Sequence, residues 1–219
     1  MMVARSGTIR FLLYLGTAPG MLGDLQAVVF DMDGTLIDSP LDFNAIRAEC
    51  GAPAGHPVLE YIEQCPEPER SRMLDVLHRH ERHAAETCTL RDGADGVLAE
   101  LAARGLLLAL LTRNSGESIR TVLRRFGLRF DCIVSRHDAE PKPSPQPVLK
   151  IAGDLGVSPH EMLVVGDYVF DVQSGHSAGA YTAFLTTRQD LKPPAESDAV
   201  IGDLRELLDL IPGSGEMPQ

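Results

Sequence analysis

Two aspartates and a glycine stand directly after a run of apolar residues. The run covers residues 25–30, and Asp31, Met32, Asp33 and Gly34 follow it. Two carboxylates in a tight turn at the end of a buried strand cost stability unless a metal ion or a ligand offsets their charge. Acids two positions apart can also divide catalytic work, one as nucleophile or metal ligand and the other as proton carrier. This segment is therefore the first candidate for an active site.

A calcium-binding loop is the alternative interpretation of the same segment. Such loops begin with Asp-x-Asp and close with a glutamate at the twelfth position. Counted from Asp31, the twelfth residue is Asp42, and other ligand positions are apolar. The calcium loop therefore has little support.

Apolar strands that alternate with amphipathic helices would position these acids. Near-continuous apolar runs indicate strands that are covered on both faces of a sheet. The expected strands lie at residues 25–30, 106–111, 132–134, 162–165, 181–185 and 199–201, the last two as edge strands. The expected helices lie at residues 94–104, 115–126, 145–155 and 169–178. This order predicts an α/β fold with a doubly wound parallel sheet.

Residues 39–90 interrupt the alternation. They contain no strong strand pattern, and two helical patterns at about 42–50 and 67–87. An insertion after the first strand lies above the carboxyl ends of the strands, where open α/β sheets bind ligands. The expected division is a leader at 1–24, a core at 25–38 and 91–212, a small helical cap at 39–90 and a tail at 213–219.

The chain is acidic, with 31 acidic and 20 basic residues and a formal charge of −11. Such a surface repels nucleic acids and anionic membranes, so we expect neither as a partner. An anionic substrate must then be attracted by a local site, and a bound divalent cation would serve this purpose. The four cysteines form no C-x-x-C pair, which indicates reduced thiols and a cytoplasmic location.

Four segments, taken together and in order, resemble the motifs of the haloacid dehalogenase superfamily of hydrolases, most closely its phosphoglycolate-phosphatase-like branch. They are Asp31-Met32-Asp33-Gly34-Thr35, Thr112 after the second long strand, Lys142 within Glu140-Pro141-Lys142-Pro143, and Gly166-Asp167-Tyr168-Val169-Phe170-Asp171. The resemblance extends from about residue 25 to residue 210. It implies the Rossmann-like core of that superfamily with a small helical cap.

The resemblance also implies a role for each acid. Asp31 would attack phosphorus and form an aspartyl phosphate, while Asp33 would protonate the leaving alkoxide and later activate water. A Mg²⁺ ion would be held by Asp31, the backbone carbonyl of Asp33, and Asp167. Asp171 would support the metal-bound waters or Lys142. The second aspartate of the first motif favours phosphoryl chemistry, because a halide leaves without a proton.

Four residues are candidates for binding the phosphoryl group besides the acids. Thr112 would donate a hydrogen bond to a phosphoryl oxygen, and Lys142 would neutralise its charge. The branch usually has Thr-Asn at the second motif, whereas this chain has Thr112-Arg113-Asn114. Arg113 and Asn114 are therefore further candidates for phosphate binding. Arg113 either reaches into the substrate cavity or only covers the edge of the sheet.

The histidine-rich segment at residues 78–83 is a weaker candidate. His80 and His83 share one face of the expected helix, but their spacing is not that of a known zinc motif. A polar helix face is the simpler interpretation. Arg47 and Arg79 could instead line the mouth of the active site and attract an anionic substrate.

Together these patterns predict a Mg²⁺-dependent phosphatase that hydrolyses a small phosphorylated metabolite, of the phosphoglycolate or sugar phosphate type. A sugar phosphomutase on the same core is the alternative, and a non-catalytic binding protein is a third hypothesis. The insertion is shorter than the usual cap of the family, which would leave an open site or one completed by a partner subunit. We expect a monomer or a homodimer.

Overall fold

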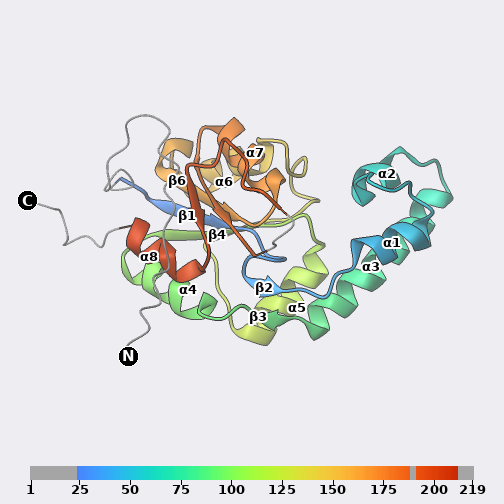
Figure 1. Cartoon of the computed structure of the whole chain (residues 1–219), viewed down its shortest axis with the longest axis horizontal. Coiled ribbons are helices and arrows are strands. Elements are labelled where there is room, and N and C mark those ends of the chain that lie inside the picture. Colours follow the sequence, from blue (N-terminus) through green and yellow to red (C-terminus); the bar gives the residue numbers. More distant parts are fainter. Residues whose placement is uncertain (1–23, 188–190, 212–219) are drawn as a thin grey trace, which may run out of the picture. The chain divides into compact units, whose positions relative to one another are not determined.

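The expected strands form one sheet in the computed structural model, which describes residues 24–187 and 191–211 (Figure 1). All six strands run parallel, in the order β5-β4-β1-β6-β7-β8. Their bounds are β1 Ala27–Phe30, β4 Leu107–Leu111, β5 Cys132–Val134, β6 Met162–Gly166, β7 Tyr181–Leu185 and β8 Ala199–Ile201. The predicted α/β class and parallel sheet are confirmed. The expected leader, apart from Asp24, and the expected tail lie outside the described residues.

The expectation that β7 is an edge strand is wrong, because β7 lies between β6 and β8. A polar residue, Thr182, lies near the start of β7. Thr182 is fully buried, yet its polar groups are satisfied: its backbone N–H and its hydroxyl both donate to the carboxylate of Asp198, at 2.8 and 3.0 Å. A buried polar group with partners costs little, so the strand can be internal.

Contacts divide the chain into two compact units, which are described separately. Among the described residues, the first consists of residues 24–38, Leu90–Arg113, 129–187 and 191–211. Its helices are α4 Ala94–Ala103, α6 Gln146–Leu155, α7 Val169–Ala178 and α8 Leu207–Leu210, with single 3-10 turns at Pro159–Glu161 and Leu204–Glu206. Figure 1 shows α6 and α7 on one face of the sheet and α4 and α8 on the other, as a doubly wound fold requires.

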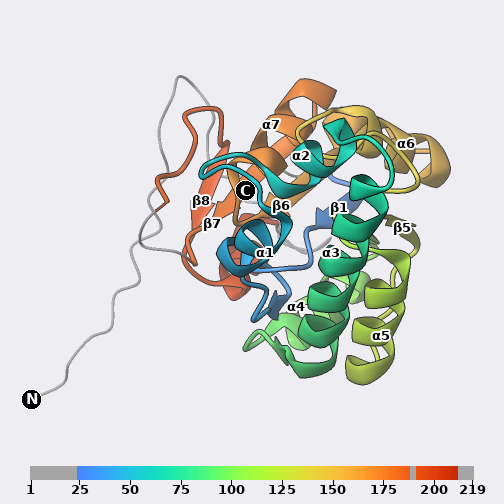
Figure 2. The same ribbon diagram turned by 90° about the vertical axis from the view of Figure 1, so that its right-hand side faces the viewer.

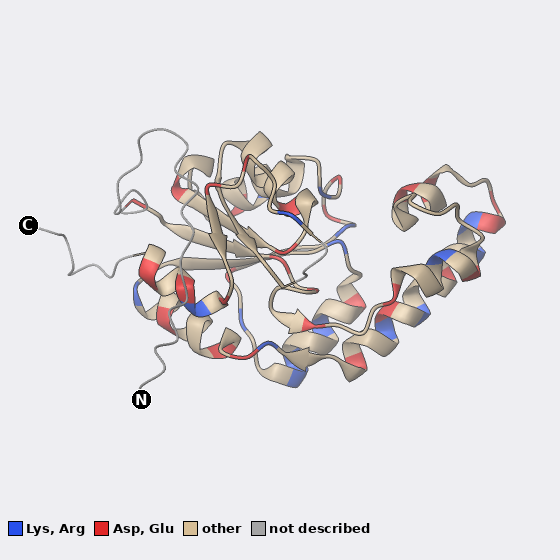
Figure 3. Cartoon of the chain, in the orientation of Figure 1, with Lys and Arg blue, Asp and Glu red and all other residues tan. Residues whose placement is uncertain are grey.

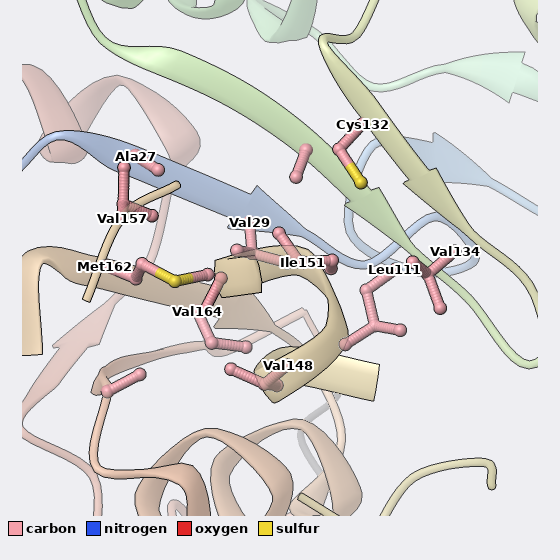
Figure 4. Packing of buried hydrophobic residues seen from close by; sticks show 13 residues of the cluster. Ala27, Val29, Leu111, Cys132, Val134, Val148, Ile151, Val157, Met162 and Val164 are labelled. Atoms are coloured by element: carbon pink, nitrogen blue, oxygen red, sulfur yellow. The ribbon is translucent and has the colours of Figure 1, made fainter. Parts of the chain in front are cut away.

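The core of the first unit lies between the sheet and α6 (Figure 4). Val148 and Ile151 of α6 belong to one buried cluster with Val29 of β1 and Val164 of β6. Val28 of β1, whose side chain points to the opposite face, is also fully buried. Burial on both faces explains why these strands are continuous apolar runs and not alternating ones.

The second unit consists of Ser39–Thr89 and Asn114–Leu128. Its helices are α1 Phe43–Cys50, α2 Val58–Gln64, α3 Glu69–Thr87 and α5 Gly116–Phe126, and Figure 2 shows α3 beside α5. Two helical patterns were expected in residues 39–90, whereas the structure has three helices there. The missed helix, α2, has only seven residues and no side-chain cap, so its sequence signal is weak.

Residues 114–128 were expected to belong with the core, whereas their contacts group them with the helices of the second unit. The guanidinium of Arg125 donates to the carbonyl of Ala85 at 2.7 Å, and Arg82 pairs with Glu117 at 3.2 Å. The expected bounds of α5 are confirmed. Ser115 accepts the N–H of Ser118 at its start, and Gly127 ends it with a left-handed φ of 67°.

Several smaller features complete the fold. Two strands of two residues, β2 Ile37–Asp38 and β3 Thr89–Leu90, form a separate short sheet that the sequence patterns did not predict. All four cysteines are free thiols, as expected, and three of them are buried. Among the described residues no helix combines the length and the apolar character needed to cross a bilayer.

Candidate active site

Three adjacent strands end at the same edge of the sheet with a polar residue. Asp31 follows β1, Thr112 follows β4 and Asp167 follows β6. The register pairs Phe30 of β1 with Leu110 of β4 and with Val165 of β6, so the three strands end at nearly the same level. The carboxyl ends of parallel strands are where α/β folds place their ligands. The sheet order therefore brings together residues that are up to 136 positions apart in the sequence.

Lys142 is buried at this edge, and its ammonium group donates three hydrogen bonds. Its Nζ donates to Oδ1 of Asp31 at 2.6 Å, to Oδ1 of Asp171 at 2.5 Å and to the carbonyl of Leu111 at 3.1 Å. An ammonium has three hydrogens, so these contacts satisfy it. Burial would lower the pKa of Lys142, but the carboxylates of Asp171 and Asp31 raise it above its usual value, so the lysine stays charged.

Three buried carboxylates surround this lysine. Asp31, Asp167 and Asp171 each offer an oxygen, and these oxygens all lie within 4.8 Å of one another. Burial raises the pKa of Asp31 well above its usual value, and the neighbouring acids add to this effect while Lys142 opposes it. Burial and then Asp171 raise the pKa of Asp167 to about 6. One ammonium cannot balance three carboxylates, so the donor set fits a divalent cation with a preference for oxygen.

The carboxylates differ in how their oxygens are used. Both oxygens of Asp171 accept a hydrogen bond, Oδ1 from Lys142 and Oδ2 from the N–H of Tyr168 at 3.0 Å. Asp171 thus accepts a hydrogen bond from Lys142 while its other oxygen is held by the backbone. Oδ1 of Asp167 accepts from the hydroxyl of Thr35 at 3.4 Å, and Oδ2 accepts from that of Thr187 at 3.2 Å. The two hydroxyls hold the Asp167 carboxylate in one orientation.

Thr187 is a site residue that the sequence analysis missed. It lies two residues beyond the end of β7, and its segment carries no motif. It reaches Asp167 because β7 is the neighbour of β6 in the sheet. The expectation that β7 is an edge strand did not say that β6 is its neighbour. Nothing in the sequence therefore pointed to Thr187 as a contact of Asp167.

Two glycines are required by close approach to the acids. A Cβ atom on Gly34 would lie 2.4 Å from Oδ2 of Asp167, and the φ of Gly34 is +87°. A Cβ atom on Gly166 would lie 2.2 Å from Cγ of Asp171. Only a glycine fits at either position. This explains why the first and fourth motifs pair an aspartate with a glycine.

Asp33 lies in the turn that follows β1 and is only partly buried. The turn is closed by the N–H of Gly34, which donates to the carbonyl of Ile37 at 2.8 Å, and by that of Ile37, which donates to the carbonyl of Met32 at 3.1 Å. The partly exposed side chain of Asp33 contrasts with the buried Asp31. A carboxyl group that is accessible to solvent suits a proton carrier.

The three consecutive residues of the second motif have different surroundings. Thr112 is buried at the end of β4. The guanidinium of Arg113 lies over the ring of Phe170 at 5.1 Å, and Phe170 lies on α7 between Asp167 and Asp171. Asn114 belongs to the second unit, where its Oδ1 accepts the N–H of Ser115 at 2.8 Å.

The histidine-rich segment lies on α3 of the second unit, along which both signs of charge occur (Figure 3). Arg79 and His80 both contact the carboxylate of Glu49 on α1, His80 at 2.8 Å. The pKa of Glu49 is lowered first by His80 and then by Arg79. Within the described residues, the acids Asp31, Asp167 and Asp171 are the group that could hold a metal ion. Ion pairing between helices therefore accounts for Arg79 and His80.

Comparisons with known proteins bear on the family to which this chain belongs. A family model described as haloacid dehalogenase-like hydrolase matches residues 44–185. An uncharacterized hydrolase of Saccharomyces cerevisiae is 34% identical over 201 residues, covering 87% of this chain and 92% of the yeast protein. The N-acetylmuramic acid 6-phosphate phosphatase of Pseudomonas aeruginosa is 30% identical over 215 residues, covering 85% of this chain and 95% of that protein.

A solved structure shares the fold. The predicted phosphoglycolate phosphatase of Haemophilus somnus superposes with a TM-score of 0.68 at 22% identity, covering 84% of this chain and 97% of that one. Fold, motifs and relatives thus lead to the same family. The chain belongs to the haloacid dehalogenase-like hydrolases, as its four motifs predict.

Proposed function

We propose that this protein is a Mg²⁺-dependent phosphatase that hydrolyses a small phosphorylated metabolite through an aspartyl phosphate on Asp31. The observation that carries this proposal is the buried group of three carboxylates around Lys142. A nucleophilic carboxylate needs cations beside it before a phosphate dianion can approach. Lys142 is one such cation, and the uncompensated acids provide a site for the other.

The metal would be held by carboxylate oxygens of Asp31 and Asp167 together with the backbone carbonyl of Asp33. When bound, Mg²⁺ would neutralise charge on the phosphoryl oxygens and on the carboxylates. Asp171, whose two oxygens already accept hydrogen bonds, would keep Lys142 in place. We further propose that residues 39–90 are the cap of the family and residues 25–38 and 91–212 its core, in which residues 114–128 are the part that contacts the helices of residues 39–90.

The reaction then follows from the residues of the chain. A carboxylate oxygen of Asp31 attacks phosphorus, and the bond from phosphorus to the ester oxygen breaks. The carboxyl group of Asp33 gives its proton to the leaving alkoxide. Asp33 next takes a proton from water, which attacks phosphorus and releases inorganic phosphate and the free Asp31 carboxylate. Thr112 donates to a phosphoryl oxygen throughout, Lys142 neutralises the charge of the phosphoryl group and of Asp31, and Arg113 and Asn114 are further candidates for phosphate binding.

The proposed substrate class is supported by a relative whose name states its substrate. N-acetylmuramic acid 6-phosphate, named in the Pseudomonas aeruginosa relative, is a phosphate ester of a sugar acid. We propose a phosphorylated sugar or small carboxylic acid, including phosphoglycolate, as the substrate. The phosphomutase and the non-catalytic binding protein are not favoured, because the yeast and Pseudomonas relatives are a hydrolase and a phosphatase, and every motif acid is present. The four free thiols suit a reducing compartment such as the cytoplasm.

The test is phosphate release from a panel of sugar phosphates, N-acetylmuramic acid 6-phosphate and phosphoglycolate, with Mg²⁺ or with EDTA. Wild type should release phosphate only with the metal, and Asp31→Asn should lose at least about 10³-fold in rate because its amide is not a nucleophile. Asp209→Asn, at an exposed aspartate of α8, is the control and should keep full activity. Release that persists in Asp31→Asn would contradict the covalent mechanism.

A further inference from the structure

Arg91 makes contacts that neither the motifs nor the proposed mechanism use. Its Nε donates to the carbonyl of Thr35 at 2.9 Å, and its Nη2 donates to the carbonyl of Gly34 at 2.7 Å. The same Nη2 lies 2.5 Å from Oδ1 of Asp38. In addition, the backbone N–H of Arg91 donates to the carbonyl of Leu36 at 2.9 Å. One residue thus binds four positions of the segment that follows Asp31 and Asp33.

The guanidinium of Arg91 binds the carbonyls of Gly34 and Thr35, and both of these residues contact Asp167. Gly34 approaches the Asp167 carboxylate so closely that no Cβ fits between them, and the hydroxyl of Thr35 donates to Asp167 at 3.4 Å. Asp33 is the residue next to Gly34 in the same turn. A shift of this turn would therefore change the position of the proton carrier and the contacts of a metal ligand together.

The residue type suits the task. A guanidinium is planar, stays charged, and presents several N–H groups in fixed directions, so it can bind two carbonyls and a carboxylate at once. The two carbonyls lie in an irregular turn, where they have no place in a helix or in the main sheet. Loss of the arginine would leave them without these donors and allow the turn to move.

We propose that Arg91 is a positioning residue that holds the turn at residues 32–36, and thereby Asp33, in the geometry needed for phosphoryl transfer. This role rests on the proposed phosphatase function. Arg91 touches neither the substrate nor a reacting atom, and it acts through the carbonyls of Gly34 and Thr35. Because its contacts are made in the protein alone, part of the proposal can be tested without any metal or substrate.

Arg104 provides a matched control within the same unit. Its guanidinium also binds two backbone carbonyls, those of Leu208 and Ile211, and one carboxylate, that of Glu100. Its side chain is 19% exposed, against 20% for Arg91. Arg104 follows the last residue of α4 and binds the C-terminal helix α8 and the residue after it. Arg91→Met and Arg104→Met therefore remove the same kinds of contact at different places.

The experiment measures steady-state kinetics with p-nitrophenyl phosphate and Mg²⁺, and backbone hydrogen exchange in the metal-free protein. For Arg91→Met we expect kcat to fall about 10- to 100-fold with KM changed less than about threefold, as for a lost positioning contact. The amides of Gly34, Leu36 and Ile37 should exchange faster. Arg104→Met should lose a similar amount of thermal stability but keep kcat and the protection of these amides.

Arg91→Lys keeps the charge with a different shape, so kcat should lie between those of wild type and Arg91→Met. This variant also carries the test if the methionine variant does not fold. Equal kcat in Arg91→Met and Arg104→Met, with unchanged exchange in the turn, would overturn the proposal. If wild type itself released no phosphate in a metal-dependent way, the proposed function would fail, while the exchange measurement would still decide whether Arg91 holds the turn.

Discussion

At the scale of single residues, charge balance dominates this site. Asp31, Asp167 and Asp171 are all buried, and Lys142 is the cation that donates hydrogen bonds to two of them. Burying a charge without a partner is costly, so such a group is kept for a purpose and not for stability. Asp167 lacks a hydrogen bond from Lys142, and its pKa is raised to about 6, first by burial. A cation bound beside Asp167 would offset this penalty.

The pH dependence of stability tests this description of Asp167. Its pKa is about 6 in the folded protein and 3.8 ordinarily, so the folded state binds the proton more tightly. The carboxylate therefore destabilises the metal-free protein above pH 6, and this penalty disappears as the pH falls from 6 towards 3.8. In EDTA at neutral pH, Asp167→Asn should raise the free energy of unfolding by about 2–3 kcal/mol.

Urea denaturation of both proteins across this pH range is the measurement. The advantage of Asp167→Asn should shrink as the pH falls through the pKa of Asp167. Asp209→Asn, at an exposed position on α8, is the control and should show no such trend. An advantage that did not depend on pH would show that Asp167 is not held with a raised pKa.

At the scale of elements, the turn after β1 determines how closely the acids approach. Its backbone is folded so that Gly34 lies against Asp167 with a left-handed φ. The strands place the ends of β1 and β6 side by side, and the turn then brings its own backbone to the end of β6. The first motif therefore supplies the carboxylates of the site and also the backbone conformation that lets Gly34 lie against Asp167.

A comparison of Gly34→Ala with Gly51→Ala separates the effect of a left-handed backbone conformation from the effect of close contact with Asp167. Gly51 ends α1 with a φ of +71°, and a Cβ there would meet nothing within 4 Å. Both variants should lose about 1 kcal/mol of stability because alanine disfavours this conformation. Only Gly34→Ala should also displace Asp167 and lose at least about 10²-fold in Mg²⁺-dependent phosphatase activity.

Unfolding curves and phosphate-release rates for the two variants provide the comparison. Equal activity in both would mean that the contact between Gly34 and Asp167 has no bearing on catalysis. A loss of activity in Gly51→Ala alone would point to the second unit instead.

At the scale of the whole molecule, the acids link metal binding to folding. The three acids follow β1 and β6 or lie on α7, so they come together only when the sheet of the first unit has formed. An ion that binds the folded chain and not the unfolded one stabilises it by mass action. Removal of Mg²⁺ should therefore lower the stability of the first unit.

We expect saturating Mg²⁺ to raise the free energy of unfolding by about 2.7 kcal/mol at a concentration 100 times its dissociation constant. Thermal unfolding with Mg²⁺ and with EDTA measures this shift. Asp167→Asn should show little or no shift, because it lacks a ligand, whereas Asp209→Asn should respond as wild type does. A shift of equal size in Asp167→Asn would place the metal elsewhere.

The sequence alone determined the features that depend on local pattern. The apolar runs predicted the six strands of the main sheet, since a strand covered on both faces must be largely apolar along its length. The helix expected at residues 115–126 agrees with α5 to within one residue, since its ends depend on the adjacent Ser115 and Gly127. The four motifs predicted the family, and with it the acids and the lysine that the fold brings together.

Tertiary structure alone decided the contacts between distant segments. The place of β7 inside the sheet, and with it the contact of Thr187 with Asp167, depends on which strands become neighbours. The grouping of residues 114–128 with the second unit depends on the packing of α3 along α5. Arg91 has no motif of its own, and its role follows from the carbonyls it meets 56 and 57 residues away. Backbone carbonyls are the same in every residue, so only the folded chain shows which of them a side chain binds.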